Sequence, residues 1–206
     1  MDFSKITQKI LPVLNLSSLE QADLIAQLMK ESNLTYLEIT LRNDNAMTVL
    51  SHILSNHPTL IVGVGTIIKS DDMFSVAESG AHFGVTPGMN STLYAAMDNS
   101  SLPIIPGVST ISEAMEAMEH GCDYVKLFPA SQIGLKTVKS WSGPLENISI
   151  CATGGLDIDS AKEWLEVPQV KMVGGGWMAP KDILNKAVNG DAESLEILRY
   201  NFQQLY

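Results

Sequence analysis

Short apolar runs recur along the chain, and each is followed by a longer segment with the periodicity of an amphipathic helix. Eight of these runs have the length and composition of strands: Ile10–Leu16, Thr35–Leu41, Leu60–Gly65, His82–Thr86, Leu102–Pro106, Asp123–Phe128, Ile148–Thr153 and Val170–Gly174. No Ser/Gly-rich linker or charge block separates the units, so we expect one α/β domain over residues 1–206. The pattern predicts a closed (β/α)8 TIM barrel with a C-terminal helix over about 191–206. A doubly wound open sheet is the alternative, because it produces a similar alternation.

Two helix starts can be predicted from local signals. Ser17 and Glu20 have the spacing of a capping box, in which both side chains accept hydrogen bonds from backbone N–H groups at the start of a helix. Pro180 follows the eighth predicted strand, and we expect it in the first turn of the next helix, where the missing N–H has no cost.

The second predicted strand has an unusual polar face. Alternation along a strand places Glu38, Thr40 and Arg42 on one side, whereas the odd-numbered positions between 37 and 41 are leucine or isoleucine. The apolar side suits packing against helices, so the polar side must point into the barrel. An unpaired buried carboxylate costs several kcal/mol, which makes this arrangement a poor choice for core packing alone. We therefore interpret Glu38 as a candidate site residue.

Lys126 is the one charged residue of the stretch 124–129, which reads as a strand whose inward positions would be Tyr124, Lys126 and Phe128. A low-dielectric interior disfavours the ammonium form, and a neutral lysine amine attacks carbonyl groups to form Schiff bases. Lys126 is therefore a candidate nucleophile that can approach Glu38 across one cavity. Two simpler interpretations stay open: a lysine on an exposed strand, and a buried Glu–Lys ion pair without chemistry.

Anion-binding features complete the candidate site. The chain has two arginines, and one of them, Arg42, ends the strand that carries Glu38, where its guanidinium could hold a carboxylate with two hydrogen bonds. Glycine clusters, Thr153-Gly154-Gly155 and Gly174-Gly175-Gly176, end the seventh and eighth strands. In barrels the loops after these two strands often bind phosphate through backbone N–H groups.

Composition excludes several classes of partner. With 23 acidic and 13 basic residues the net charge is −10, which repels nucleic acid and anionic lipid. No apolar run approaches 18 residues and no leader-like N-terminus is present, so we expect a cytoplasmic protein without a membrane segment. Cys122 and Cys151 lack CxxC spacing and the four histidines form no ligand motif, so the sequence predicts neither a disulfide nor a metal site.

The ordered motifs resemble a known family. They are Leu37-Glu38-Ile39-Thr40-Leu41-Arg42, Gly63-Val64-Gly65-Thr66, Val85-Thr86-Pro87-Gly88, Ile105-Pro106-Gly107-Val108-Ser109-Thr110, Val125-Lys126-Leu127-Phe128-Pro129-Ala130, Thr153-Gly154-Gly155 and Gly174-Gly175-Gly176-Trp177. In order and spacing the chain resembles the bacterial 2-keto-3-deoxy-6-phosphogluconate (KDPG) and 4-hydroxy-2-oxoglutarate (KHG) aldolases. These are class I enzymes of the (β/α)8 barrel type, and the resemblance runs from about residue 10 to residue 180.

The resemblance implies a role for each matching residue. Lys126 would form the Schiff base and Glu38 would be the general acid and base. The remaining matches fall at the two ends of the substrate: Arg42, Thr66, Pro87 and Phe128 at the pyruvyl end, and Thr153, Gly154, Gly155, Gly175 and Gly176 at the phosphate end. It also implies a homotrimer that needs no cofactor or metal and acts on a small, phosphorylated 2-keto acid.

Three positions depart from the family pattern. Gly176 stands where many members have serine or threonine, Ser131 where a glutamate often occurs, and Asn15 where many have arginine. All three concern the distal part of the substrate. The preferred aldehyde therefore stays open, and so do two other functions: a phosphosugar isomerase or epimerase without a covalent intermediate, and a non-catalytic member of the fold.

Overall fold

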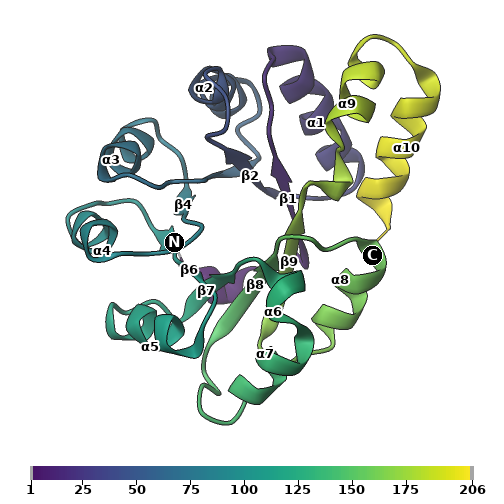
Figure 1. Ribbon diagram of the computed structural model, residues 1–206. Helices are drawn as coiled ribbons and strands as arrows, with labels where there is room; N and C mark the ends of the chain where they lie inside the picture. The colour runs from purple at the N-terminus through teal and green to yellow at the C-terminus, as the bar shows by residue number, and fades with distance from the viewer. Residues whose placement is uncertain (1, 205–206) are drawn as a thin grey trace.

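The structure is a computed structural model that describes residues 2–204. Strands surround a central axis, and helices cover them on the outside (Figure 1). The strands are β1 (Ile10–Leu14), β2 (Tyr36–Thr40), β3 (Ile61–Gly65), β4 (Phe83–Val85), β5 (Ile104–Ile105), β6 (Gly107–Val108), β7 (Tyr124–Leu127), β8 (Ser149–Thr153) and β9 (Val170–Gly175). The α-helices are α1 (Leu19–Glu31), α2 (Ala46–Asn56), α3 (Ser70–Glu78), α4 (Ser91–Asp98), α5 (Ile111–Glu119), α6 (Ala130–Ile133), α7 (Leu135–Trp141), α8 (Ile158–Leu165), α9 (Lys181–Val188) and α10 (Ala192–Gln203). Two 3₁₀ turns, η1 (Phe3–Lys5) and η2 (Gly176–Met178), complete the elements.

The strands form a parallel barrel with the order β5-β4-β3-β2-β1-β9-β8-β7-β6. The two end members, β5 and β6, are consecutive in the chain and only Pro106 lies between them. They are two halves of one strand, of which β5 pairs with β4 and β6 pairs with β7. The order is thus circular, and the predicted (β/α)8 barrel is confirmed against the open doubly wound sheet.

The fifth strand differs from its prediction in one respect. The predicted run 102–106 ends at Pro106, whereas the structure continues the strand beyond it as Gly107–Val108. Proline has no N–H for a strand ladder, which is why the hydrogen-bond pattern breaks there. The Pro106 carbonyl still accepts a hydrogen bond from Lys126 N at 2.8 Å, so the strand stays attached to β7.

The helix starts are shifted by one residue from the predicted positions. Ser18, not Ser17, caps α1 by accepting from Gln21 N, and the reciprocal acceptor is Gln21 Oε1, to which Ser17 N donates at 2.7 Å. Pro180 is the N-cap of α9 and not part of its first turn. The predicted C-terminal helix corresponds to α10, whereas positions 205–206 lie outside the described residues.

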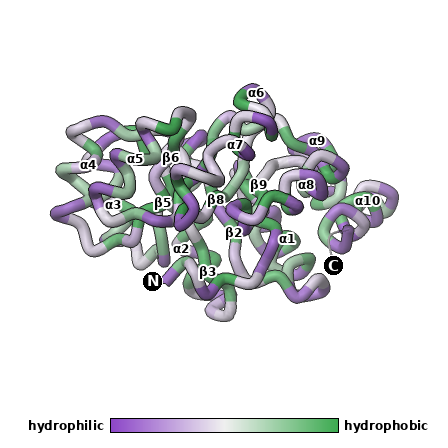
Figure 2. The backbone as a smooth tube through the Cα atoms, turned by 90° about the horizontal axis from the view of Figure 1, so that it is seen from below, coloured by the Kyte–Doolittle hydropathy of each residue, from purple (hydrophilic) through white to green (hydrophobic). Residues whose placement is uncertain are grey.

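Apolar side chains form a layer between strands and helices and a floor inside the barrel. Both colours alternate along the outer helices in Figure 2, as expected for helices that bury one side only. The floor consists of Leu11, Phe83, Val85, Ile105, Tyr124, Cys151 and Met172. Phe3 of η1 covers the floor on the side where the strands begin, with its ring 5.9 Å from Phe83, the first residue of β4, and 5.6 Å from Tyr124, the first residue of β7. The polar site must therefore lie above this floor, on the side of the carboxyl ends of the strands.

Among residues 2–204, the helices are too short or too polar for any of them to cross a bilayer.

Candidate active site

Glu38 and Lys126 meet inside the barrel above the apolar floor. Glu38 is in β2 and Lys126 in β7, and Lys126 Nζ lies 3.3 Å from Glu38 Oε1. Both side chains are almost fully buried, with exposed fractions of 1% and 7%. The second carboxylate oxygen, Glu38 Oε2, has no hydrogen-bond partner within residues 2–204. A buried acceptor without a partner is costly, so this oxygen is free to bind a water or a substrate hydroxyl.

Gly65 provides the space that the Glu38 carboxylate occupies. Gly65 is the last residue of β3 and pairs with Thr40 of β2. A Cβ atom placed on Gly65 would collide with Glu38 Oε1. The collision involves a fully buried carboxylate and not a flexible surface side chain. Glycine at this position therefore keeps the carboxylate oriented toward Lys126.

Buried and half-buried groups surround the amine. Cys151 of β8 pairs with Lys126 in the sheet, and its thiol is fully buried. Burial raises the pKa of this thiol to about 12, with smaller and opposite effects from Lys126 and Glu38, so the thiol is protonated at neutral pH. The Phe128 ring lies 5.5 Å from Lys126 Nζ. A protonated thiol leaves Lys126 as the candidate nucleophile beside Glu38.

Arg42 and Thr66 lie together at the rim. Arg42 follows β2 and is exposed, and its Nε donates to Thr66 Oγ1 at 3.3 Å. Thr66 follows β3 with a φ of 65°, which is unfavourable for a β-branched residue. Strained residues of this kind are concentrated at ligand-binding sites. The guanidinium thus lies beyond the carboxyl end of β2, the strand that carries Glu38.

Pro87 lies close to the barrel wall at the end of β4. It is half-buried, and its backbone packs so tightly on Gly107 that a Cβ atom there would collide with the Pro87 carbonyl carbon. Pro87 follows β4, as Thr66 follows β3 and Phe128 follows β7, so all three residues lie at the carboxyl ends of the strands.

The glycine turn after β8 packs directly onto the residues after β7. Gly154 and Gly155 have φ values of 96° and 71°, which few other residues adopt. A side chain on Gly154 would meet the Phe128 ring at 2.9 Å, and one on Gly155 would collide with Ser131. Thr153, just before the turn, has a buried Oγ1 without a partner in the described part of the chain. The turn can thus offer both backbone N–H groups and a free hydroxyl.

Gly176 is in a different environment, beside the end of β1. Its φ is not in the left-handed region, and the nearest atom to an added Cβ would be the Val13 carbonyl oxygen at 3.4 Å. A serine would therefore fit here. Gly175, in contrast, packs against the Trp177 ring and has no room for a side chain.

A pocket of about 170 Å³ opens beside Gly176. Lys181, which the sequence analysis did not select, contributes a positively charged side chain to its lining. Its lining includes Asn15, Arg42, Gly176 and Lys181. Asn15 is held by Asn43, whose Nδ2 donates to Asn15 Oδ1 at 2.6 Å. Lys181 begins α9, at the positive end of the helix dipole, where a lysine is electrostatically unfavourable. A lysine at this unfavourable position of a helix was the signal in the sequence that could have identified Lys181. Its place in the pocket lining is a reason for a lysine there.

The structure also brings together residues that sequence spacing left apart. The sequence predicted no metal site because the spacing of the four histidines matches no ligand motif. In the structure Asp23, His52 and His57 converge on the outside of the barrel.

Comparisons with known proteins agree with this geometry. A family model described as KDPG and KHG aldolase matches residues 3–195. The chain is 35% identical to the 2-dehydro-3-deoxy-phosphogluconate aldolase of Pseudoalteromonas atlantica, covering 84% of this chain and 81% of that protein. It is 34% identical to the KHG/KDPG aldolase of Escherichia coli K12, covering 86% and 84%. Among solved structures, KDPG aldolase from Legionella pneumophila, with pyruvate captured as a covalent carbinolamine, superposes with a TM-score of 0.88 at 29% identity, covering 96% of this chain and 93% of that one.

Fold and site therefore define a barrel enzyme of the lyase class, an aldolase with a lysine nucleophile. The chain belongs to the KDPG and KHG aldolase family. Membership decides against the isomerase or epimerase and against the non-catalytic protein that the sequence had left open.

Proposed function

We propose that the chain splits KDPG, KHG or both into pyruvate and an aldehyde, with Lys126 as the Schiff-base residue. The observation that carries the proposal is the buried contact of 3.3 Å between Lys126 Nζ and Glu38 Oε1, beside an unpaired Glu38 Oε2. One nucleophile and one proton acceptor thus lie in contact, and both are buried from solvent. Family membership and the carbinolamine in the Legionella pneumophila relative support the same chemistry.

In the first step, the Lys126 amine attacks the C2 ketone of the substrate to form a carbinolamine. Loss of water then produces a protonated imine, which withdraws electrons from C3. Arg42 is suited to hold the C1 carboxylate during this step, because a guanidinium binds a carboxylate through two hydrogen bonds. The contact with Thr66 Oγ1 supports this orientation of Arg42. Pro87 and Phe128 form apolar walls around the pyruvyl part.

In the second step, Glu38 accepts the proton of the C4 hydroxyl, directly or through a water, while the C3–C4 bond breaks. The bonding electrons move into the imine, leaving a pyruvate enamine and releasing the aldehyde. Glu38 then returns a proton to C3, and water hydrolyses the imine to release pyruvate and restore the amine. General acid and base catalysis of this kind contributes about 10²–10⁴-fold.

The distal phosphate, where present, is assigned to the turn after β8 and to the β9–α9 connection. Backbone N–H groups at Gly154, Gly155, Gly175 and Gly176, together with the Thr153 hydroxyl, supply neutral donors. We also assign Lys181 to this end, because it lines the same pocket as Gly176 and Asn15. Its ammonium would supply the positive charge that Asn15 cannot.

Borohydride trapping with pyruvate tests the catalytic assignments. Reduction of the imine converts it into a stable carboxyethyl adduct, which peptide mapping should place on Lys126. Lys126→Ala should abolish the adduct, whereas the matched change Lys139→Ala on the exposed side of α7 should not. An adduct on Lys136 or Lys139 of the wild-type enzyme would refute the assignment of the nucleophile.

Glu38→Gln should separate the two roles. The amide preserves the shape of the side chain but cannot accept a proton, so kcat should fall by about 10²–10⁴-fold while trapping persists. Wild-type turnover in this variant would remove Glu38 from the mechanism.

We further infer a homotrimer located in the cytoplasm. The resemblance to the family supports the trimer, and exposed apolar side chains on α3 and α5, namely Phe74, Met115 and Met118, are available for subunit contacts. The two free thiols, Cys122 and Cys151, suit a reducing compartment. Analytical ultracentrifugation should give three times the chain mass of 22.3 kDa, and a monomer at micromolar concentration would contradict the trimer.

A further inference from the structure

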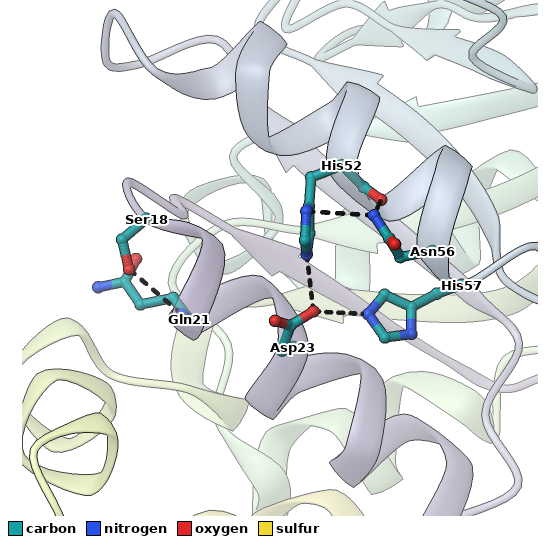
Figure 3. Close-up of polar contacts among 6 residues, drawn as sticks. All are labelled: Ser18, Gln21, Asp23, His52, Asn56 and His57. Atoms are coloured by element: carbon teal, nitrogen blue, oxygen red, sulfur yellow. Dashed lines mark hydrogen bonds and ion pairs between the residues drawn. The ribbon is translucent and has the colours of Figure 1, made fainter.

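Two histidines and an aspartate converge on the outer layer of the barrel, away from Lys126. Asp23 lies in α1, His52 in α2, and His57 directly follows α2. Figure 3 shows both imidazole rings directed at the Asp23 carboxylate from the side of α2. His52 Nε2 lies 2.7 Å and His57 Nε2 2.8 Å from Asp23 Oδ1, and the ligand atoms of all three residues lie within 4.8 Å of one another.

We propose that Asp23, His52 and His57 form a binding site for a divalent transition metal of the zinc type, which joins α1 to α2. Two imidazole nitrogens and one carboxylate oxygen are a ligand set that Zn²⁺ uses, with a water in the fourth position. The site belongs to the helical layer and is independent of the aldolase reaction.

The separations suit a metal after a small adjustment. Ligand atoms about 2.0–2.1 Å from a tetrahedral Zn²⁺ lie about 3.3 Å from one another. Each imidazole would therefore withdraw from the Asp23 oxygen by about half an ångström, which side-chain rotation permits. The carboxylate is 54% exposed, so a cation can enter from solvent and a water can complete its coordination. The histidines are more buried, at 21% and 27%, which limits how far the rings can move.

The neighbouring groups support binding of a cation. Glu20, one turn before Asp23, adds a negative charge that acts on both Asp23 and His52. Lys30, which lines the groove beside His57, is the opposing cation in this layer.

Asn56 fixes the tautomer of His52 in the metal-free cluster. Its Nδ2 donates to the His52 carbonyl oxygen at 2.9 Å and lies 3.2 Å from His52 Nδ1 (Figure 3), so Nδ1 is an acceptor and the ring proton is on Nε2, 2.7 Å from Asp23 Oδ1. A metal at Nε2 would displace this proton to Nδ1, and the Asn56 amide would then have to move away from the ring. In the metal-free protein the same three side chains remain a hydrogen-bonded cluster.

Zinc titration of the full chain, stripped with a chelator and then dialysed, tests the proposal. Isothermal calorimetry with ZnCl₂ should show one ion per chain for the wild type. His52→Ala and His57→Ala should each weaken binding at least about 10-fold, since even changes around the ligands have effects of this size. His120→Ala is the matched control: His120 Nδ1 lies 3.7 Å from Asp98 Oδ2, but within residues 2–204 no second histidine joins that pair.

Thermal unfolding provides a second readout. At 100 times the dissociation constant, zinc should raise the melting midpoint of the wild type and of His120→Ala by about 5–10 °C, and that of His52→Ala by much less. If His52→Ala fails to fold, Asp23→Asn keeps the shape of the side chain but removes the charged ligand, and should weaken binding by at least about 10-fold. Equal zinc affinity in wild type, His52→Ala and His57→Ala would overturn the site, as would binding lost only in Cys122→Ser. Borohydride trapping should be the same with and without zinc, so this proposal can fail while the aldolase assignment holds.

Discussion

At the scale of single residues, the site depends on two charged side chains that are 88 positions apart in the chain. Glu38 and Lys126 would each be costly to bury alone, and their contact reduces that cost without satisfying Glu38 Oε2. A purely structural ion pair would gain from hydrogen bonds to both oxygens. The free acceptor is consistent with a carboxylate that must receive a proton during each turnover.

Gly65→Ala should reduce activity without preventing folding. The new methyl group collides with Glu38 Oε1, so the carboxylate must move away from Lys126. A displacement of about 1 Å costs about 100-fold in rate, and we expect a loss of that size in kcat/KM for pyruvate release. Gly143→Ala is the matched control, because no atom of the described residues lies within 4 Å of its added Cβ. Wild-type kinetics in a folded Gly65→Ala variant would show that this contact does not position the base.

At the scale of elements, the connection from β9 to α9 determines the distal end of the pocket. The chain passes from Gly175 through η2 to Pro180. This path places Gly176 and Lys181, which are five positions apart, in the lining of the same pocket. The glycine removes a hydroxyl donor, whereas the lysine adds a charge. We therefore expect the two residues to affect phosphate recognition in opposite directions.

Gly176→Ser should improve binding of the phosphorylated substrate. The added hydroxyl has room beside Val13, and a hydrogen bond to a charged group contributes about 1.5–3 kcal/mol. The KM for KDPG should fall by at least about 10-fold, while that for unphosphorylated KHG stays nearly constant. Steady-state kinetics on both substrates are the measurement, and equal changes for the two would place Gly176 outside a phosphate site.

Lys181→Met should have the opposite effect. Methionine keeps an unbranched chain of similar reach but removes the charge, so the KM for KDPG should rise by about 10-fold while KHG is less affected. Lys186→Met on the same helix is the matched control, because Lys186 lies outside the pocket that contains Gly176. If both variants respond alike, the long-range charge of α9 explains the effect and a contact at Lys181 does not.

At the scale of the whole molecule, the closed barrel separates stability from chemistry. The floor around Phe83 and Tyr124 is apolar and is closed from below by Phe3, whereas the polar groups lie toward the other end. In barrels of this kind the loops at the carboxyl ends of strands carry the chemistry. Changes in the floor should consequently affect stability first.

Phe83→Ala should destabilise the protein strongly. Phe83 is 1% exposed and fills the space beside Gly63, so its removal leaves a cavity that costs about 3–5 kcal/mol. Urea unfolding followed by circular dichroism measures the loss. Tyr200→Ala, at an aromatic residue that is 62% exposed, should change stability by less than about 1 kcal/mol. Similar losses for both would mean that the floor is not a principal source of stability.

The sequence by itself determined the eight strand–helix units and the inward faces of β2 and β7, because side-chain alternation and helical periodicity are local properties. The order of its motifs also indicated the family. Local signals could not determine that the barrel closes through a strand divided at Pro106, since closure depends on which distant strands pair. They also could not bring Lys181 into the pocket of Gly176, or Asp23 beside His52 and His57, because these contacts depend on how helices pack on the barrel and on one another. Residue chemistry was thus readable along the chain, whereas tertiary structure decided which of these residues meet.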